Sequence, residues 1–143
     1  MTSVVLVVDV ANVMGSRPDG WWKDRAGAAA RLVSSLVPLA GQRVPLGPDG
    51  APVHVVRVVA VVEGQARAMT VPDDVRAAVE VVLAARDGDS AVVEVAAAVL
   101  APPTGAAPLV VTADRGLRER LPAGSLVTGP RALLDLLRGP DPH

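Results

Sequence analysis

Cysteine is absent from this sequence of 143 residues. Without thiols the chain has no disulfide, no thiolate zinc site, no iron–sulfur cluster and no cysteine nucleophile. Histidine is scarce: His54 falls within a predicted strand and His143 is the last residue, so the two make no metal-binding pair. Any metal site built from this chain would therefore use oxygen ligands.

Aromatic residues and long apolar runs are also scarce. Phe and Tyr are absent, and Trp21 and Trp22 are the only aromatic residues. The apolar half of the chain is mostly Val, Ala and Leu, which suits a buried sheet covered by Ala-rich helices. No apolar run approaches the ~18 residues of a membrane span. A basic region followed by an apolar signal-peptide core is also missing. We therefore expect a cytoplasmic protein with no membrane partner.

The chain lacks an excess of charge of either sign, because its formal net charge is −1. The net charge does not indicate a nucleic-acid partner, so a positively charged surface that binds nucleic acid would have to be a local patch. The length matches one domain, and we expect it to cover residues 1–138, with a flexible tail at 139–143.

The apolar pattern predicts strands that alternate with helices. Predicted strands are 4–8, 53–62, 79–84, 109–112 and 126–128, and predicted helices are 24–39, 90–100, 115–121 and 131–137. A hairpin around the turn at 48–50 leads into strand 53–62, and Asp24 and Asp89 are expected to cap their helices. Segment 75–85 could also be a helix, but the turn signal "RDGD" favours a strand. Alternation of this kind predicts a three-layer α/β/α fold with a mostly parallel central sheet.

Acidic residues follow four successive predicted strands. Asp9 ends the first strand, Glu63 follows the second, Asp87 and Asp89 follow the third, and Asp114 follows the fourth. The carboxyl ends of parallel strands share one edge, where open α/β sheets bind ligands. We therefore expect these five acids to converge there.

Converging carboxylates repel one another unless a cation or a proton intervenes. Oxygen ligands without imidazole or thiolate favour Mg²⁺ or Mn²⁺, which can serve displacement at a phosphodiester. Each acid also has an ordinary explanation: Asp89 as a helix cap, Asp87 as a turn residue, and Glu63 as an ion-pair partner of Arg67. The agreement of four strand ends favours the metal hypothesis.

Candidate substrate contacts lie near the same edge. The loop at 15–22, which includes Ser16 and Trp21, is a candidate substrate lid, in which a tryptophan either stacks on a base or packs the loop onto the core. Trp21 is expected to lie nearer the ligand than Trp22, and Thr112 to bond Asp114 or the backbone. Cations that could meet phosphate oxygens, or be ordinary surface charge, are Arg17, Lys23, Arg115 and Arg118.

Other phosphate chemistries fit poorly. The segment after the first strand, "DVANVMG", lacks the G-x-G-x-x-G dinucleotide fingerprint, and no P-loop is present. A haloacid-dehalogenase-type phosphatase would have a second Asp where this chain has Ala11. Ser16 has no histidine partner for nucleophilic catalysis.

Three segments resemble the motifs of NYN domains, which belong to the PIN-like nuclease superfamily. These are "VVDVANVMG", "GDSAVVEVA" and "VVTADRGLRERL", in the family's order across residues 4–137. The segment "NVMGSRPDGWW" is similar to one in small actinobacterial NYN-like proteins that are sometimes labelled nucleoside-triphosphate pyrophosphohydrolases. The resemblance implies a PIN-like, Rossmann-like fold.

The resemblance also implies a Mg²⁺- or Mn²⁺-dependent ribonuclease site that acts on RNA. By position, Asp9, Asp89 and Asp114 would be catalytic metal ligands, with Glu63 or Asp87 completing the set. Asn12 would orient Asp9 or contact a phosphate.

Two other classes of function stay open at this point. One is a phosphohydrolase of small nucleotides, which suits a near-neutral chain. The other is a catalytically silent binding or regulatory module, motivated by Gly116, which stands where many NYN relatives have a further Asp. A homodimer is a further candidate assembly.

Overall fold

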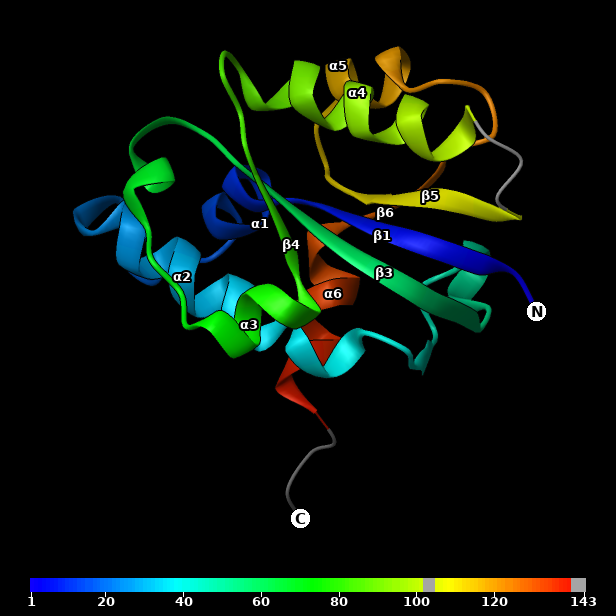
Figure 1. The fold of residues 1–143 in the computed structure, drawn as a ribbon, viewed down its shortest axis with the longest axis horizontal. Helices are drawn as coiled ribbons and strands as arrows, with labels where there is room; N and C mark the ends of the chain where they lie inside the picture. The colour runs from blue at the N-terminus through cyan, green and yellow to red at the C-terminus, as the bar shows by residue number, and fades with distance from the viewer. Residues whose placement is uncertain (102–104, 140–143) are drawn as a thin grey trace.

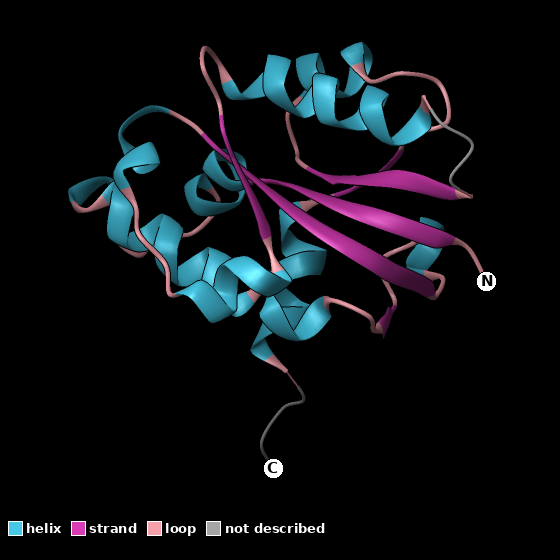
Figure 2. Cartoon of the chain, viewed as in Figure 1, coloured by secondary structure: helices cyan, strands magenta, loops and turns pink. Residues whose placement is uncertain are grey.

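The computed structural model describes residues 1–101 and 105–139, which form three α/β/α layers (Figures 1 and 2). The sheet has the order β2-β3-β1-β5-β6, and β4 pairs with β3 beside this path. All pairs are parallel except β2 with β3. The strands are β1 (Ser3–Asp9), β2 (Arg43–Val44), β3 (Val53–Val62), β4 (Glu80–Leu83), β5 (Ala106–Val111) and β6 (Leu126–Thr128). This confirms the predicted α/β class and the mostly parallel sheet.

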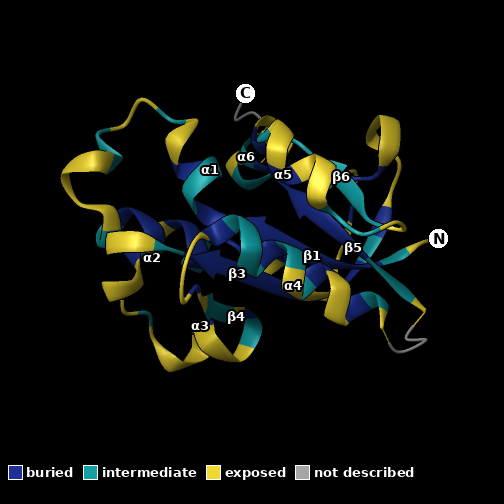
Figure 3. Ribbon diagram, turned by 90° about the horizontal axis from the view of Figure 1, so that it is seen from above, coloured by how far each residue is buried: buried dark blue, intermediate teal, exposed yellow. Residues whose placement is uncertain are grey.

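The central strand β1 is apolar on both faces because both faces are covered. Leu6 packs into one core cluster, and its neighbours Val5 and Val7 pack into the other, on the opposite face of the sheet. This burial explains the unbroken β-branched run in the sequence. The central strands β1 and β5 and the second half of β3, from Val58 to Val62, are accordingly mostly buried (Figure 3).

The helices divide between the two faces of the sheet. On one face lie α1 (Val10–Gly15), α2 (Arg25–Ser35), α3 (Asp73–Ala78) and α6 (Pro130–Arg138). On the other lie α4 (Gly88–Leu100) and α5 (Arg115–Arg120) (Figure 1). Short 3₁₀ turns occupy Trp21–Lys23, Val37–Leu39, Pro48–Gly50 and Gly64–Ala68. No described helix has the length and apolar character needed to cross a bilayer.

Most predicted elements are confirmed, including the hairpin, in which Arg43 pairs with His54. Segment 75–85, for which a strand and a helix were both considered, contains the end of helix α3 (Asp73–Ala78) followed by strand β4 (Glu80–Leu83). Helix α1 was not predicted. Residues 140–143 of the predicted tail lie outside the described part of the chain.

The expected cap of α4 was wrong. The helix begins at Gly88, and its N-cap is Asp87, whose Oδ1 accepts the backbone N–H of Ser90 at 2.7 Å. Asp89 lies inside the first turn, where its carboxylate is free of the capping role. Asp24 caps α2 as predicted, because its carboxylate accepts the N–H of Gly27 at 2.9 Å.

Candidate active site at the carboxyl edge of the sheet

Asp9 is the last residue of β1, and its side chain is only 6% exposed. Its Oδ2 accepts a hydrogen bond from the Thr112 hydroxyl at 3.0 Å, and its Oδ1 accepts the backbone N–H of Asn12 at 3.3 Å. The first bond joins β1 to the end of β5, and the second caps α1. Each carboxylate oxygen keeps a second lone pair, so Asp9 is positioned with acceptor capacity to spare.

Burial raises the pKa of Asp9 from 3.8 to about 6. The hydrogen bonds from Thr112 and Asn12 oppose this shift, because they stabilise the ionised form. The nearby charges of Asp89 and Glu63 add to it. Asp9 is therefore a carboxylate whose negative charge is costly in the folded protein unless a positive charge joins it.

Asp89 lies on the first turn of α4 and is partly buried. Burial raises its pKa, and the charges of Asp114 and Glu63 raise the pKa further. The charge of Asp89 is thus influenced by neighbouring carboxylates. We call Asp9, Glu63, Asp89 and Asp114 the acidic edge. The charges of Asp89 and Glu63 act on Asp9, and those of Asp114, Glu63 and, more weakly, Asp87 act on Asp89.

Glu63 and Asp114 each hold a backbone amide with one carboxylate oxygen. Glu63 follows β3 and accepts the N–H of Gly88, and a side chain at Gly88 would meet its Oε2 at 2.6 Å. Asp114 caps α5, accepting the N–H of Leu117 at 2.9 Å. These bonds position both acids, and each carboxylate keeps a second oxygen for which no hydrogen bond within the described residues is observed.

Asp87, which the sequence also offers as a metal ligand, caps α4 in the structure. Its two carboxylate oxygens accept the backbone N–H and the hydroxyl of Ser90, at 2.7 and 3.1 Å. The backbone hydrogen bond from Ser90 is the main cause that lowers the pKa of Asp87. Asp87 is exposed, and its carboxylate is engaged in capping α4.

The donor set suits a hard divalent cation, since every ionisable ligand at the acidic edge is a carboxylate. Within the described residues, no three His, Cys, Asp or Glu side chains are grouped closely enough to hold one ion directly. Mg²⁺ is commonly bound by one or two carboxylates while it keeps several waters. The pairwise proximity of Asp9, Asp89 and Glu63 fits that mode of binding.

Three of the predicted substrate contacts make hydrogen bonds around Asp9: Asn12, Thr112 and Arg118. The side-chain oxygen of Asn12 accepts the N–H of Ala113 at 2.8 Å, so it is the backbone of Asn12, not the side chain, that contacts Asp9. Thr112 accepts the N–H of Asp114 at 3.1 Å, as expected. Arg118 donates two hydrogen bonds to the Thr112 carbonyl, at 2.9 and 3.3 Å. Together these bonds hold the β5–α5 loop against α1.

The loop after α1 is held by its own contacts. Ser16 donates its hydroxyl hydrogen bond to the carbonyl of Val13 at 2.6 Å. Trp21 packs against the core and lies 5.3 Å from the guanidinium of Arg25, which confirms that one tryptophan anchors the loop. Trp22 meets Trp21 edge-on and is 53% exposed. Trp21 and the acidic-edge residue Glu63 also line the same cavity.

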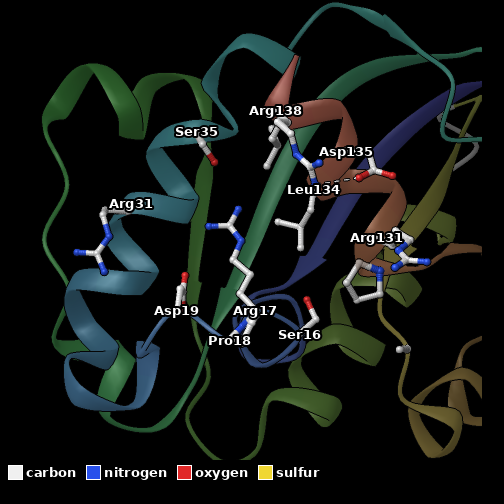
Figure 4. Close-up of a pocket in the computed structure, with 13 residues that line it drawn as sticks. Ser16, Arg17, Pro18, Asp19, Arg31, Ser35, Arg131, Leu134, Asp135 and Arg138 are labelled. Carbon is white, nitrogen blue, oxygen red and sulfur yellow. Dashed lines mark hydrogen bonds and ion pairs between the residues drawn. The ribbon is translucent and has the colours of Figure 1, made fainter. Parts of the chain in front are cut away.

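The remaining predicted cations divide by location. Lys23 and Arg115 are exposed, whereas Arg17 is half-buried and points into a hollow between α2 and α6 (Figure 4). Arg31 and Arg131 line the same hollow and were not predicted as site residues. No local signal could have identified them, because Arg31 and Arg131 lie on helices α2 and α6, which are far apart in the sequence.

The mostly parallel sheet with helices on both faces has the architecture of a PIN-like, Rossmann-like fold. No family model and no curated protein matches the sequence. Among solved structures, the chain is similar to Rae1 (YacP) from Bacillus subtilis. Its W164L mutant superposes with a TM-score of 0.62 at 18% identity, over 96% of this chain and 76% of that one. A second structure of Rae1 gives 0.59 at 20% identity, over 94% and 73%. The likeness establishes the fold.

Proposed function

We propose that this protein is a divalent-metal-dependent nuclease that hydrolyses phosphodiester bonds of RNA. The observation that carries the proposal is Asp9, a buried carboxylate whose pKa is raised to about 6 and whose neighbours are further acids. A buried negative charge lowers the stability of the folded protein, and a bound cation offsets that cost. The order of the NYN-like motifs supports the same assignment.

At neutral pH Asp9 is mostly ionised, because that pH lies above its raised pKa. Thr112 and Asn12 donate hydrogen bonds to its two oxygens, and Asp89, in the first turn of α4, is near enough for its charge to raise the pKa of Asp9. These residues would hold Mg²⁺ or Mn²⁺, which would supply an activated water and charge neutralisation at phosphorus. Water then adds across one P–O bond and yields a phosphate monoester and an alcohol. Arg115, exposed beside Asp114, is available to bind a phosphate oxygen.

The test is cleavage of 5′-labelled single-stranded RNA in Mn²⁺ by the wild type and by Asp9→Asn. The matched control is Asp49→Asn, because Asp49 is exposed on the hairpin before β3, at the opposite end of the sheet. Loss of a first metal ligand should slow cleavage at least about 100-fold, whereas the control should cleave as the wild type does. Equal cleavage by Asp9→Asn and the wild type would overturn the proposal.

A panel of nucleoside triphosphates forms the second arm of the test. The near-neutral charge of the chain, −1, is the observation that favours a small-nucleotide substrate over long RNA. Release of phosphate or pyrophosphate without RNA cleavage would replace the nuclease by a nucleotide phosphohydrolase. If the protein cleaves neither RNA nor nucleoside triphosphates, both enzymatic assignments are overturned and the protein is a binding module.

A further inference from the structure

A hollow of about 830 Å³ opens between the loop after α1, helix α2 and helix α6. None of the acidic-edge carboxylates lines it, so it is a separate feature of the surface. Its wall includes Ala113, the residue directly before Asp114, and the hollow therefore adjoins the acidic edge. Arg17 projects from the loop into the space between α2 and α6 (Figure 4).

The hollow carries a local excess of positive charge. Four arginines and two aspartates line it, in a chain whose formal net charge is −1. Both aspartates already have partners: Asp135 pairs with Arg138 at 3.2 Å, and Asp19 accepts the N–H of Trp21 at 3.2 Å. Within the described part of the chain, three guanidinium groups of the hollow have no carboxylate at ion-pair distance: Arg17, Arg31 and Arg131.

This combination of groups matches the chemistry of a nucleotide. Guanidinium groups bind phosphate oxygens through paired N–H donors. Leu134 and Pro130 add an apolar wall on α6, against which a base or a ribose can lie. The volume falls within the range of about 300–1,000 Å³ that holds small-molecule ligands in proteins. A site for an inorganic anion alone would not need the apolar wall.

We propose that the hollow binds a nucleotide unit, with its phosphate on Arg17 and its base or sugar against Leu134. Arg131, on the other side of Leu134 in Figure 4, binds an adjoining phosphate of the same strand. This assignment rests on the proposed function. In a single-stranded RNA substrate, the nucleotide in the hollow would be next to the nucleotide whose phosphodiester lies at the acidic edge. The continuity of the two features through Ala113 places the two units in succession. The hollow also supplies the local electrostatic footprint that a near-neutral chain requires.

The test measures binding without metal, so that it does not depend on catalysis. A fluorescein-labelled single-stranded oligouridylate and free uridine monophosphate are titrated in EDTA against the wild type, Arg17→Gln and Arg131→Gln. The control is Arg43→Gln, because Arg43 is exposed on β2 at the far end of the sheet. Circular dichroism verifies that each variant is folded, and methyl NMR of Leu134 locates the ligand independently of any substitution.

Each hollow variant should bind the oligonucleotide about tenfold more weakly, because it lacks one charge-assisted hydrogen-bonding group. The slope of log affinity against log salt should fall by about 0.7 when a substitution removes one arginine–phosphate pair. The control should bind unchanged, and the Leu134 methyl resonances should shift in the wild type. Wild-type affinity in both hollow variants, or no shift at Leu134, would overturn the proposal.

The two ligands separate the sources of the nucleotide. Tighter binding of the oligonucleotide than of uridine monophosphate, with both weakened by Arg17→Gln, supports a subsite on an RNA path. Equal affinity for the two ligands supports a site for the free nucleotide and removes the link to RNA. Binding that survives in Asp9→Asn, together with loss of cleavage, would establish the hollow and the acidic edge as independent features.

Discussion

The substitution Asp9→Asn should stabilise the metal-free protein above pH 6 and should not stabilise it at pH 4. Burial raises the pKa of Asp9 from 3.8 to about 6, so the folded protein binds this proton more tightly than the unfolded chain does. Stability therefore falls as the pH rises from about 4 to 6. A shift of this size costs the metal-free protein about 3 kcal/mol above pH 6, at 1.36 kcal/mol per pKa unit. A cation at the acidic edge would offset that cost.

Asn is close to Asp in shape but carries no charge. It cannot accept both hydrogen bonds that reach Asp9, from Thr112 and Asn12, and the loss of one costs about 1 kcal/mol. The metal-free variant should thus be more stable than the wild type by about 2 kcal/mol at pH 7.5, or about 6–8 °C in Tm. At pH 4 most of the charge penalty is gone, and the variant should be equal to or less stable than the wild type.

Urea unfolding followed by far-ultraviolet circular dichroism in EDTA, at pH 4.0 and 7.5, measures both differences. Asp49→Asn is the control, since Asp49 is exposed at a positive φ of 55° that Asn also adopts readily. Its stability difference from the wild type should not change with pH. If Asp9→Asn is less stable than the wild type by the same amount at both pH values, the assignment of a costly buried charge is refuted.

Three further substitutions test the contacts of the acidic edge. Thr112→Val should raise the pKa of Asp9 above about 6, because it removes the hydroxyl that stabilises the ionised carboxylate, and Glu63→Gln should lower this pKa by removing a like charge. Carbon-13 NMR titration of the Asp9 carboxyl measures both, and shifts of the opposite sign would contradict these contacts. Gly88→Ala should cost about 1 kcal/mol, because its Cβ would meet Glu63 Oε2 at 2.6 Å and displace that hydrogen bond. Gly129→Ala, whose Cβ meets open space, is its control in urea unfolding, and equal stability of the two variants would contradict the contact.

The strands and the acids that follow them could be predicted from the sequence because their signals are local. A continuous valine run identifies a strand buried on both faces, and the next polar residue marks its carboxyl end. Asp9 and Glu63 were located in this way. Helix α1 was missed because a six-residue helix with β-branched valines carries little periodic signal.

The parts that could not be predicted depend on contacts between distant segments. Asn12 bonds Ala113, which lies 101 residues away, so its role in holding the β5–α5 loop has no signature near residue 12. Asp87 and Asp89 both precede Ser90, and only the backbone of the first turn decides which one caps α4. The arginines of the hollow likewise meet only when α2 and α6 pack on the same face of the sheet.

The central claim is that the acidic edge holds a divalent cation, and anomalous diffraction from Mn²⁺-soaked crystals tests it most directly. We expect a manganese peak in contact with a carboxylate oxygen of Asp9 and near Asp89, and no such peak in crystals of Asp9→Asn. A map with manganese bound elsewhere on the protein but none at Asp9 would contradict it.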